Sequence, residues 1–100
     1  MILTTTQSIE DYKILAYRGI VSGTAVNIQK TTFTFNMEKF YEGMSDCVSE
    51  VKTKAFNQLQ EEAEKLNANA VVGISVDIEV TSSSYVMVSI TGTAVSIVKR

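Results

Sequence analysis

The sequence predicts a single α+β domain over residues 1–100, in which an antiparallel sheet is packed by one long and one short helix. Three observations support this fold class. An apolar stripe at helical spacing runs through 48–66, strict apolar–polar alternation fills 70–80, and a second strand-like run covers 85–98. A chain of 100 residues fits one domain. Such a domain buries roughly 60–70% of its unfolded surface, which is enough for it to fold alone.

The composition is ordinary for a soluble domain and excludes several classes of function. Hydrophobic residues make up 45% of the chain, charged residues 20%, and the net charge is −2. Lys and Arg are scattered, so we expect no nucleic acid or anionic membrane among the partners. No apolar run approaches the ~20 residues of a membrane helix. The start "MILTTTQSIEDYK" has no basic or apolar signal-peptide region, and the single Cys47 cannot form an internal disulfide. These features favour the cytoplasm.

The first strands are predicted near the N-terminus. "MILTT" is a short strand candidate, and "YKILAYRGIV" at 12–21 is a stronger one because it is rich in aromatic and β-branched residues. In the "VSGTAV" that follows, Gly23 suggests a turn or a bulge. Residues 24–35 are compatible with either strand or loop.

Two helices are expected in the middle of the chain. Asn36 is a plausible N-cap for a short helix over 37–43 that ends at Gly43, and Ser45 would cap a longer one. In the long helix, apolar residues recur at spacings of 3, 4, 4, 4 and 3. This stripe consists of Val48, Val51, Ala55, Leu59, Ala63 and Leu66, and the charged Glu61, Glu62, Glu64 and Lys65 fall mostly off it.

The segment "NANA" at 67–70, after the stripe, contains only small residues and could be a corner or a ligand-binding loop. A phosphate-binding loop usually has several glycines before a helix N-terminus, whereas here a helix ends and no glycine occurs before Gly73. Asn is the usual substitute for glycine in a left-handed helix cap. We therefore expect Asn67 to end the helix and turn the chain into a strand.

The last third of the chain predicts an antiparallel hairpin with "TSSS" at 81–84 as its turn. In the first strand one face is apolar, with Val72, Ile74, Val76, Ile78 and Val80. In the second strand the apolar phase changes: Val86, Val88 and Ile90 share one phase, and Val95 and Ile97 take the other. Either a bulge near Gly92 resets the register, or the second face is buried by another subunit.

Several stretches together resemble the YbjQ-like proteins, small bacterial proteins described as "putative heavy-metal-binding". The similar stretches are "MILTTTQSI", "YKILAYRGIVSGTAV", "EEAEKLNANAVVGISVDIE" and "VMVSITGTAVSI", in matching order. The resemblance implies a dodecin-like subunit assembled as a ring-shaped homopentamer, without an established biochemical function. Two departures stand out: "YEGMSDCVSE" replaces a Gly-Gly-Arg-Ser-type segment, and Asn67 stands where members usually have glycine.

The chain carries few ligands for a heavy metal. Soft metals need clustered thiolates or imidazoles, and the chain has no His and one Cys. We therefore expect no metal site within one subunit. Cys47 fits a small buried hydrophobe better than a reactive or metal-binding thiol. The acidic run Glu61, Glu62 and Glu64 fits a solvated helix face better than a cation site, because neighbouring helical residues point in different directions.

Other polar residues have similar alternatives. Asp77 and Glu79 share a strand face and could meet a partner's cations or Ca²⁺ across a ring. Arg18 could pair with a carboxylate within the fold or bind an anion. Ser22 in "GIVSG" is out of frame for a nucleophile elbow, since it directly precedes Gly23, and the commonest general base, His, is absent.

The sequence thus predicts no catalytic residue, no enzyme activity and no cofactor. The function it favours is that of a cytoplasmic homo-oligomeric binding or scaffold protein, with a small-molecule or ion site at subunit junctions. The alternative, implied by the family description, is a heavy-metal-binding protein. The resemblance sets the expected assembly at five copies of an 11.0 kDa chain.

Overall fold

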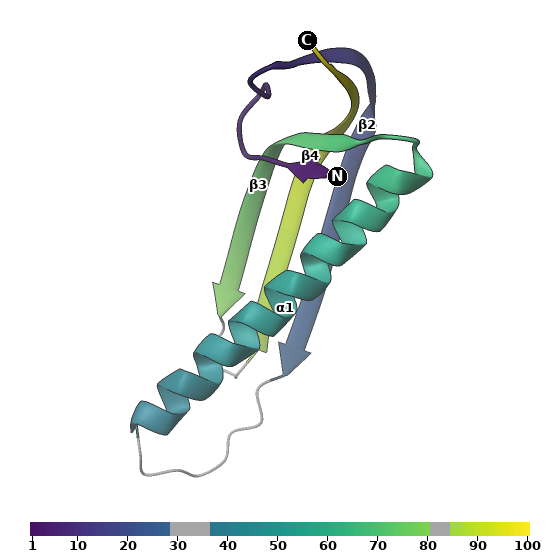
Figure 1. The fold of residues 1–100 in the computed structure, drawn as a ribbon. Helices are drawn as coiled ribbons and strands as arrows, with labels where there is room; N and C mark the ends of the chain where they lie inside the picture. Colours follow the sequence, from purple (N-terminus) through teal and green to yellow (C-terminus); the bar gives the residue numbers. More distant parts are fainter. Residues whose placement is uncertain (29–36, 81–84) are drawn as a thin grey trace.

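A computed structural model describes the backbone of residues 1–28, 37–80 and 85–100, and the side chains of 1–26, 48–80 and 85–100. A long helix lies against one face of a four-stranded sheet, which curls over at the end that holds both termini (Figure 1). In chain order the elements are β1 (Ile2–Leu3), β2 (Tyr12–Ile28), α1 (Met37–Lys65), β3 (Ala70–Val80) and β4 (Tyr85–Lys99). Across the sheet the strand order is β1-β3-β4-β2.

Both strands of the predicted hairpin and both N-terminal strands are present, whereas the turn predicted at 81–84 lies outside the described residues. The sheet is mixed rather than antiparallel. β4 pairs antiparallel with β2 and β3, whereas β1 pairs parallel with β3. A parallel pair needs a long crossover that returns the chain to the same end of the sheet. Here β2 and α1 lie between the two paired strands along the chain and form that crossover.

The predicted short helix over 37–43 is not separate, because α1 is one continuous helix of 29 residues. Gly43 and Ser45, expected at a helix end and a helix start, both lie inside it. A glycine within a helix costs only about 1 kcal/mol relative to alanine, so a local break signal of this size is easily overridden. Asn36 and 29–35 lie outside the described residues, whereas 24–28 belong to β2.

The predicted helical stripe is confirmed over most of its length. Val51, Ala55, Leu59 and Ala63 are fully buried against the sheet, with Val48 partly buried beside them. The stripe ends earlier than predicted, since Leu66 follows the end of α1 and is 39% exposed.

Gly23 is not in a turn, which corrects the sequence-based expectation. It lies within β2, opposite Ile90, and the pairing continues through it without a register shift. A β-carbon at this position would overlap the backbone carbonyl of Ala55 in α1. Glycine is therefore required for the close approach of helix and strand.

Asn67 ends α1 as predicted. Its φ is 60°, in the left-handed region. The N–H of Ala68 donates to the carbonyl of Ala63 over 3.1 Å, and the N–H of Asn67 donates to that of Glu64 over 3.0 Å. These two bonds form the Schellman motif, which satisfies the last carbonyls of a helix. The segment is a corner between α1 and β3.

The apolar core has two parts, one on each face of the sheet. The larger lies between α1 and the sheet, and includes Leu59 and Ile90. The smaller lies on the opposite face, near the termini. It consists of Ala70, Val72, Val95 and Ile97, with Ile2 and Ile9 of the N-terminal segment and Tyr12 and Ile14 of β2 packed against it.

These two cores explain the phase change in β4; the bulge predicted near Gly92 does occur at that level of the hairpin, but in β3. Gly92 pairs with Val21 without a shift, so no bulge resets β4 there. The extra residue is in β3, between Val72 and Ser75, where Gly73 has φ 61°. Val95 is fully buried within the chain itself, so no second subunit is needed to cover it.

Candidate functional site

The sheet has two open edges, and they differ in length. β2 is an edge strand over its whole length. β3 is covered near its start by β1 and by two further bonds, from Gly73 N–H to Thr6 O over 2.8 Å and from Ile74 N–H to Thr4 O over 3.1 Å. From residue 75 to residue 80, β3 has β4 as its only partner strand within the described part of the chain. We call residues 75–80 the β3 edge and the outer side of β2 the β2 edge.

Both edges expose apolar side chains. On β2 the most exposed are Ile20, at 84%, and Tyr17, at 73%. β2 has two bulges at which its register against β4 shifts. Tyr17 lies between them, and Ile20 follows the second. On the β3 edge, Val76, Ile78 and Val80 are each between a third and a half exposed; we call these three residues the β3 strip. Exposed strand edges with apolar side chains are places where another chain can add.

The β3 strip is open because of where α1 lies. Val76, Ile78 and Val80 pair directly with Ile90, Val88 and Val86, which are fully buried on the α1 face. The strip therefore also faces the α1 side of the sheet. However, the described residues of α1 pack mainly on β2 and β4 and touch β3 little, so they leave the outer flank of β3 uncovered.

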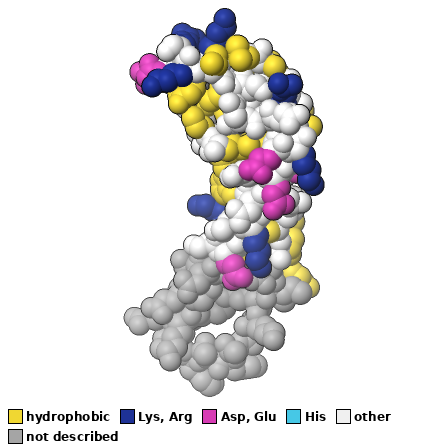
Figure 2. Space-filling view, turned by 45° about the vertical axis from the view of Figure 1, so that its right-hand side comes forward, with side chains coloured by type: hydrophobic (Ala, Val, Ile, Leu, Met, Phe, Trp, Pro, Cys, Tyr) yellow, Lys and Arg dark blue, Asp and Glu magenta, His cyan; other side chains and the backbone are white. Residues whose placement is uncertain are grey.

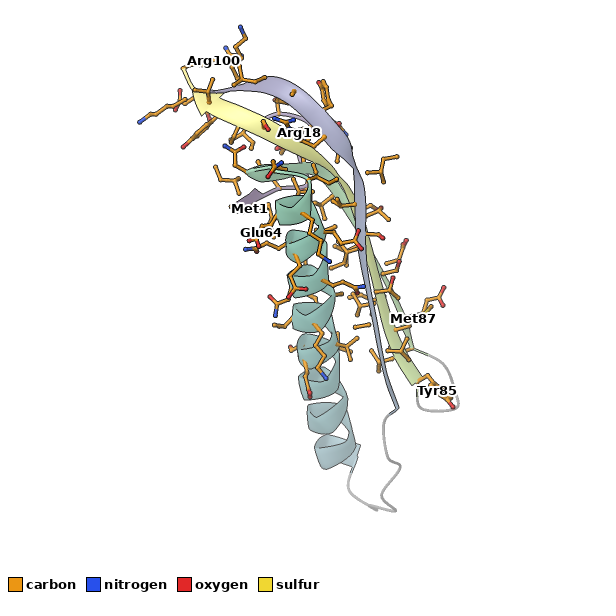
Figure 3. All side chains as sticks on the ribbon, turned by 90° about the vertical axis from the view of Figure 1, so that its right-hand side faces the viewer. Met1, Arg18, Glu64, Tyr85, Met87 and Arg100 are labelled. Atoms are coloured by element: carbon orange, nitrogen blue, oxygen red, sulfur yellow. The ribbon has the colours of Figure 1, made fainter. Side chains whose placement is uncertain are left out.

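The face of the sheet that is turned away from α1 carries hydroxyl groups in the half that is farther from the termini. Ser75, Thr91 and Ser22 form one row across β3, β4 and β2, and Asp77, Ser89 and Thr24 form the next. We call these residues the hydroxyl face. Figure 3 shows side chains on this side, Met87 among them, pointing away from α1. No layer formed by the described residues covers it.

One contact shows which backbone groups face outward at the β2 edge. The N–H of Thr24 donates to Oε1 of Gln58 in α1 over 2.9 Å. This N–H therefore belongs to the outer side of β2 and not to the ladder with β4. Because ladder groups alternate along an antiparallel pair, Ser22 and Val26 also direct their backbone groups outward.

The acidic residues that the sequence singled out lie apart on the surface. Glu61, Glu62 and Glu64 are all exposed on α1, and Glu64 points away from the sheet (Figure 3). On the face drawn in Figure 2, acidic and basic side chains are interspersed along the described part of the molecule. Their placement agrees with a solvated helix face. Asp77 and Glu79 are exposed on the face opposite α1.

The other residues singled out in the sequence are Arg18, Ser22 and Cys47. Among the described residues Arg18 pairs with no carboxylate; its Nε donates to Oγ of Ser96 over 2.8 Å, and Ser96 Oγ donates to the carbonyl of Asn67 over 3.4 Å. Ser22 is an exposed strand residue of the hydroxyl face. Cys47 falls within α1, but its side chain is outside the described residues.

Two further observations concern the described residues only. Among them, no three of the His, Cys, Asp and Glu side chains gather closely enough to hold a metal ion. Within the same part of the chain, no helix is both long and apolar enough to span a bilayer.

Sequence reasoning missed the β2 edge as a candidate surface. The pattern of 12–21 predicts only a strand and does not indicate that Leu15, Tyr17 and Ile20 lie on an edge strand, whose alternation two bulges break. A signal was present nonetheless. Large apolar residues occupy both phases of "YKILAYRGIV", and an internal strand and an edge strand cannot be distinguished without the strand order.

The fold and these surfaces define a small α+β domain whose described part has two edge strands, β2 and the 75–80 part of β3. The chain belongs to the YbjQ_1 family, whose description is "Putative heavy-metal-binding" and whose model matches residues 1–98. The predicted family resemblance is thereby confirmed. A UPF0145 protein of Clostridium botulinum (strain Eklund 17B / Type B) is 38% identical over 104 residues, covering 95% of this chain and 97% of the relative.

A solved structure supports the fold. The crystal structure of a protein of unknown function, from the DUF74 family of Pediococcus pentosaceus ATCC 25745, superimposes with a TM-score of 0.73. The match covers 98% of each chain at 19% sequence identity. At this identity the likeness shows the fold alone.

Proposed function

We propose that this protein is a homo-oligomeric binding or scaffold protein whose copies close into a ring. The observation that carries the proposal is the shape of the single chain. Its radius of gyration is 16.7 Å and its extents are 56 × 22 × 16 Å. A compact chain of this length has a radius of about 13 Å. A thin, elongated subunit of this kind is well suited to packing side by side with its copies.

The surface area supports the same proposal. The chain exposes 6845 Å². A folded monomer of its mass exposes about 5,600 Å², so the excess is about 1,200 Å². In a ring each copy forms two junctions, and the excess then corresponds to about 600 Å² from each partner at each junction. That area lies at the lower limit of standard stable interfaces, which bury about 1,200–2,000 Å² in total.

Closure into a ring would also cover the exposed edges of the sheet. Each copy has two different open edges, β2 and β3, so a head-to-tail contact would leave no copy with a free edge once the ring closes. The family resemblance implies five dodecin-like subunits, roughly 55 kDa for an 11.0 kDa chain. A ligand site at the junctions is supported by polar side chains next to both edges: Ser22 and Thr24 on β2, and Ser75 and Asp77 on β3. Such a site would suit a small polar molecule or an ion.

Native mass spectrometry and sedimentation at micromolar concentration test the proposal. We expect the wild-type chain at a multiple of 11.0 kDa, with any ligand present at one copy per junction. Val26→Lys places a charge on the β2 edge at a side chain that is 56% exposed, so it should weaken the assembly without unfolding the chain. Asn57→Lys adds the same charge to the exposed outer side of α1 and should leave the assembly intact. A stable monomer near 11.0 kDa would contradict the proposal.

Heavy-metal binding is the second candidate, and the family description favours it. With one Cys and no His in the chain, a soft-metal site would need Cys47 from several copies. Elemental analysis of protein purified without a His tag tests this function. We expect no tight, stoichiometric zinc or copper binding by a single chain. Submicromolar binding that survives Cys47→Ser would show that other ligands are used.

A further inference from the structure

We infer that the ring junction is a parallel pairing of the β2 edge of one copy with the β3 edge of the next, in which the second copy's β3 strip becomes covered by the first copy's β2 and α1. This inference rests on the proposed function and adds which surfaces meet. It follows from the backbone alternation, the strand directions and the position of α1.

The backbone groups of the β3 edge are directed outward at the strip itself. Thr24 turns its backbone away from β4, so its partner Ser89 turns its backbone toward β3. Ser89 pairs with Asp77, whose backbone groups must then point to β4. By alternation Val76, Ile78 and Val80 direct theirs to the open side. Within the described residues these N–H and C=O groups face no partner strand, so the strip presents them together with apolar side chains.

The directions of the strands allow the same edge-to-edge contact to repeat from each copy to the next. β2 and β3 are both antiparallel to β4, so they run parallel to each other. When β2 of one copy lies along β3 of the next, all helices stay on one side of a continuous sheet. Each outward residue of the strip then lies across from an α1-face residue of the neighbouring β2, such as Val21 or Gly23. Parallel pairing requires this alternation.

The same contact covers the apolar strip. The described residues of its own α1 leave the outer flank of β3 open, whereas α1 of the neighbouring copy packs on the β2 that pairs with it. The strip then lies between two helices. The N-terminal segment limits the contact, because Thr4 and Thr6 already bind β3 as far as Ile74. Only the part from residue 75 onward is available to a neighbour.

Engineered disulfides test the junction. In a Cys47→Ser background, Asp77→Cys is combined with Thr24→Cys, and in two further variants with Ser22→Cys or Val26→Cys to sample neighbouring registers. Within one chain Asp77 and Thr24 are separated by β4, a distance of about 9–10 Å that a disulfide cannot bridge. A bond can therefore form only between copies. We expect at least one pair to give, on mild oxidation, a ladder of covalent multimers that ends at the closed ring.

The outcomes separate this inference from the proposed function. No ladder from any of the three pairs, with a ring still present in native mass spectra, overturns the junction and leaves the assembly standing. Covalent dimers from Thr24→Cys or Asp77→Cys alone would show like edges facing each other and also overturn it. A monomer in native mass spectra contradicts the junction and the proposed function together.

A matched pair of charge substitutions provides a second measurement. Ile78 in the strip is 46% exposed and Val98 near the end of β4 is 45% exposed, but β4 is an internal strand and Val98 lies outside the junction. Ile78→Lys should weaken assembly at least tenfold in sedimentation while the circular dichroism spectrum keeps its helix and strand content. Val98→Lys should assemble as the wild type does. Equal assembly of the two variants would overturn the inference.

Discussion

The two ends of the β3–β4 hairpin differ in how many of their faces are covered. Near the termini both faces are buried: α1-side residues such as Val71 and Ala94 pack in the larger core, and Val72 and Val95 pack under the N-terminal segment. Toward the hairpin turn one face carries the β3 strip beside the larger core, and the other is the hydroxyl face. The same two strands therefore change from a buried sheet to a half-buried one along their length.

This difference shows that apolar residues in both strand phases need not indicate a second subunit. The phase change at Val95 and Ile97 was predicted to reflect either a bulge at Gly92 or burial by another copy, but the chain's own Ile2 and Ile9 pack against these residues. A charge at Val95 or Ile97 should therefore unfold the subunit rather than merely dissociate a ring. Among the described residues, the surfaces that expose most of the large apolar side chains are the edges instead.

The largest expected effect comes from Val95→Asp in the doubly covered end. Val95 is fully buried among apolar side chains, so an ionised carboxylate there has no partner. We expect a loss of about 4 kcal/mol or more in the free energy of unfolding, enough to unfold a marginal domain. Circular dichroism with urea titration at fixed protein concentration measures it. Thr91→Asp, on the exposed hydroxyl face, is the control and should fold normally.

A smaller loss is expected for Leu59→Ala in the core that both ends share. Leu59 is the largest side chain of the α1 stripe and is fully buried against the sheet. Its truncation leaves a cavity and should lower the free energy of unfolding by about 2–5 kcal/mol. Leu66→Ala, at a partly exposed position beyond the helix end, is the comparison and should cost much less. A loss below about 0.5 kcal/mol for Leu59→Ala would mean that the stripe is misassigned.

The smallest effect is expected for Thr91→Val on the hydroxyl face. The side chain is exposed and lies in the half of the sheet that no described layer covers. We expect a change of less than about 0.5 kcal/mol in the free energy of unfolding. Urea titration at the same protein concentration measures it, because the stability of an oligomer depends on concentration. A clearly larger change would show that this face is buried in the assembled protein.

The sequence by itself determined the features that depend on neighbours a few residues apart. The burial of Val51, Ala55, Leu59 and Ala63 follows from a spacing that places them on one side of a helix. The left-handed Asn67 follows from the small set of residues that tolerate that conformation. The same kind of local pattern predicted the strands of the hairpin and the N-terminal strands, and sequence motifs indicated the family.

Only the tertiary structure decided which distant segments meet. The parallel pairing of β1 with β3, the approach of Gly23 to Ala55, and the N-terminal cover over Val95 each join residues tens of positions apart. Local spacing cannot report such contacts, because a glycine in a turn and a glycine under a helix look alike in a sequence, as do an edge strand and an internal one. The open β2 and β3 edges belong to this group: they depend on strand order, which is set by the packing of the whole chain.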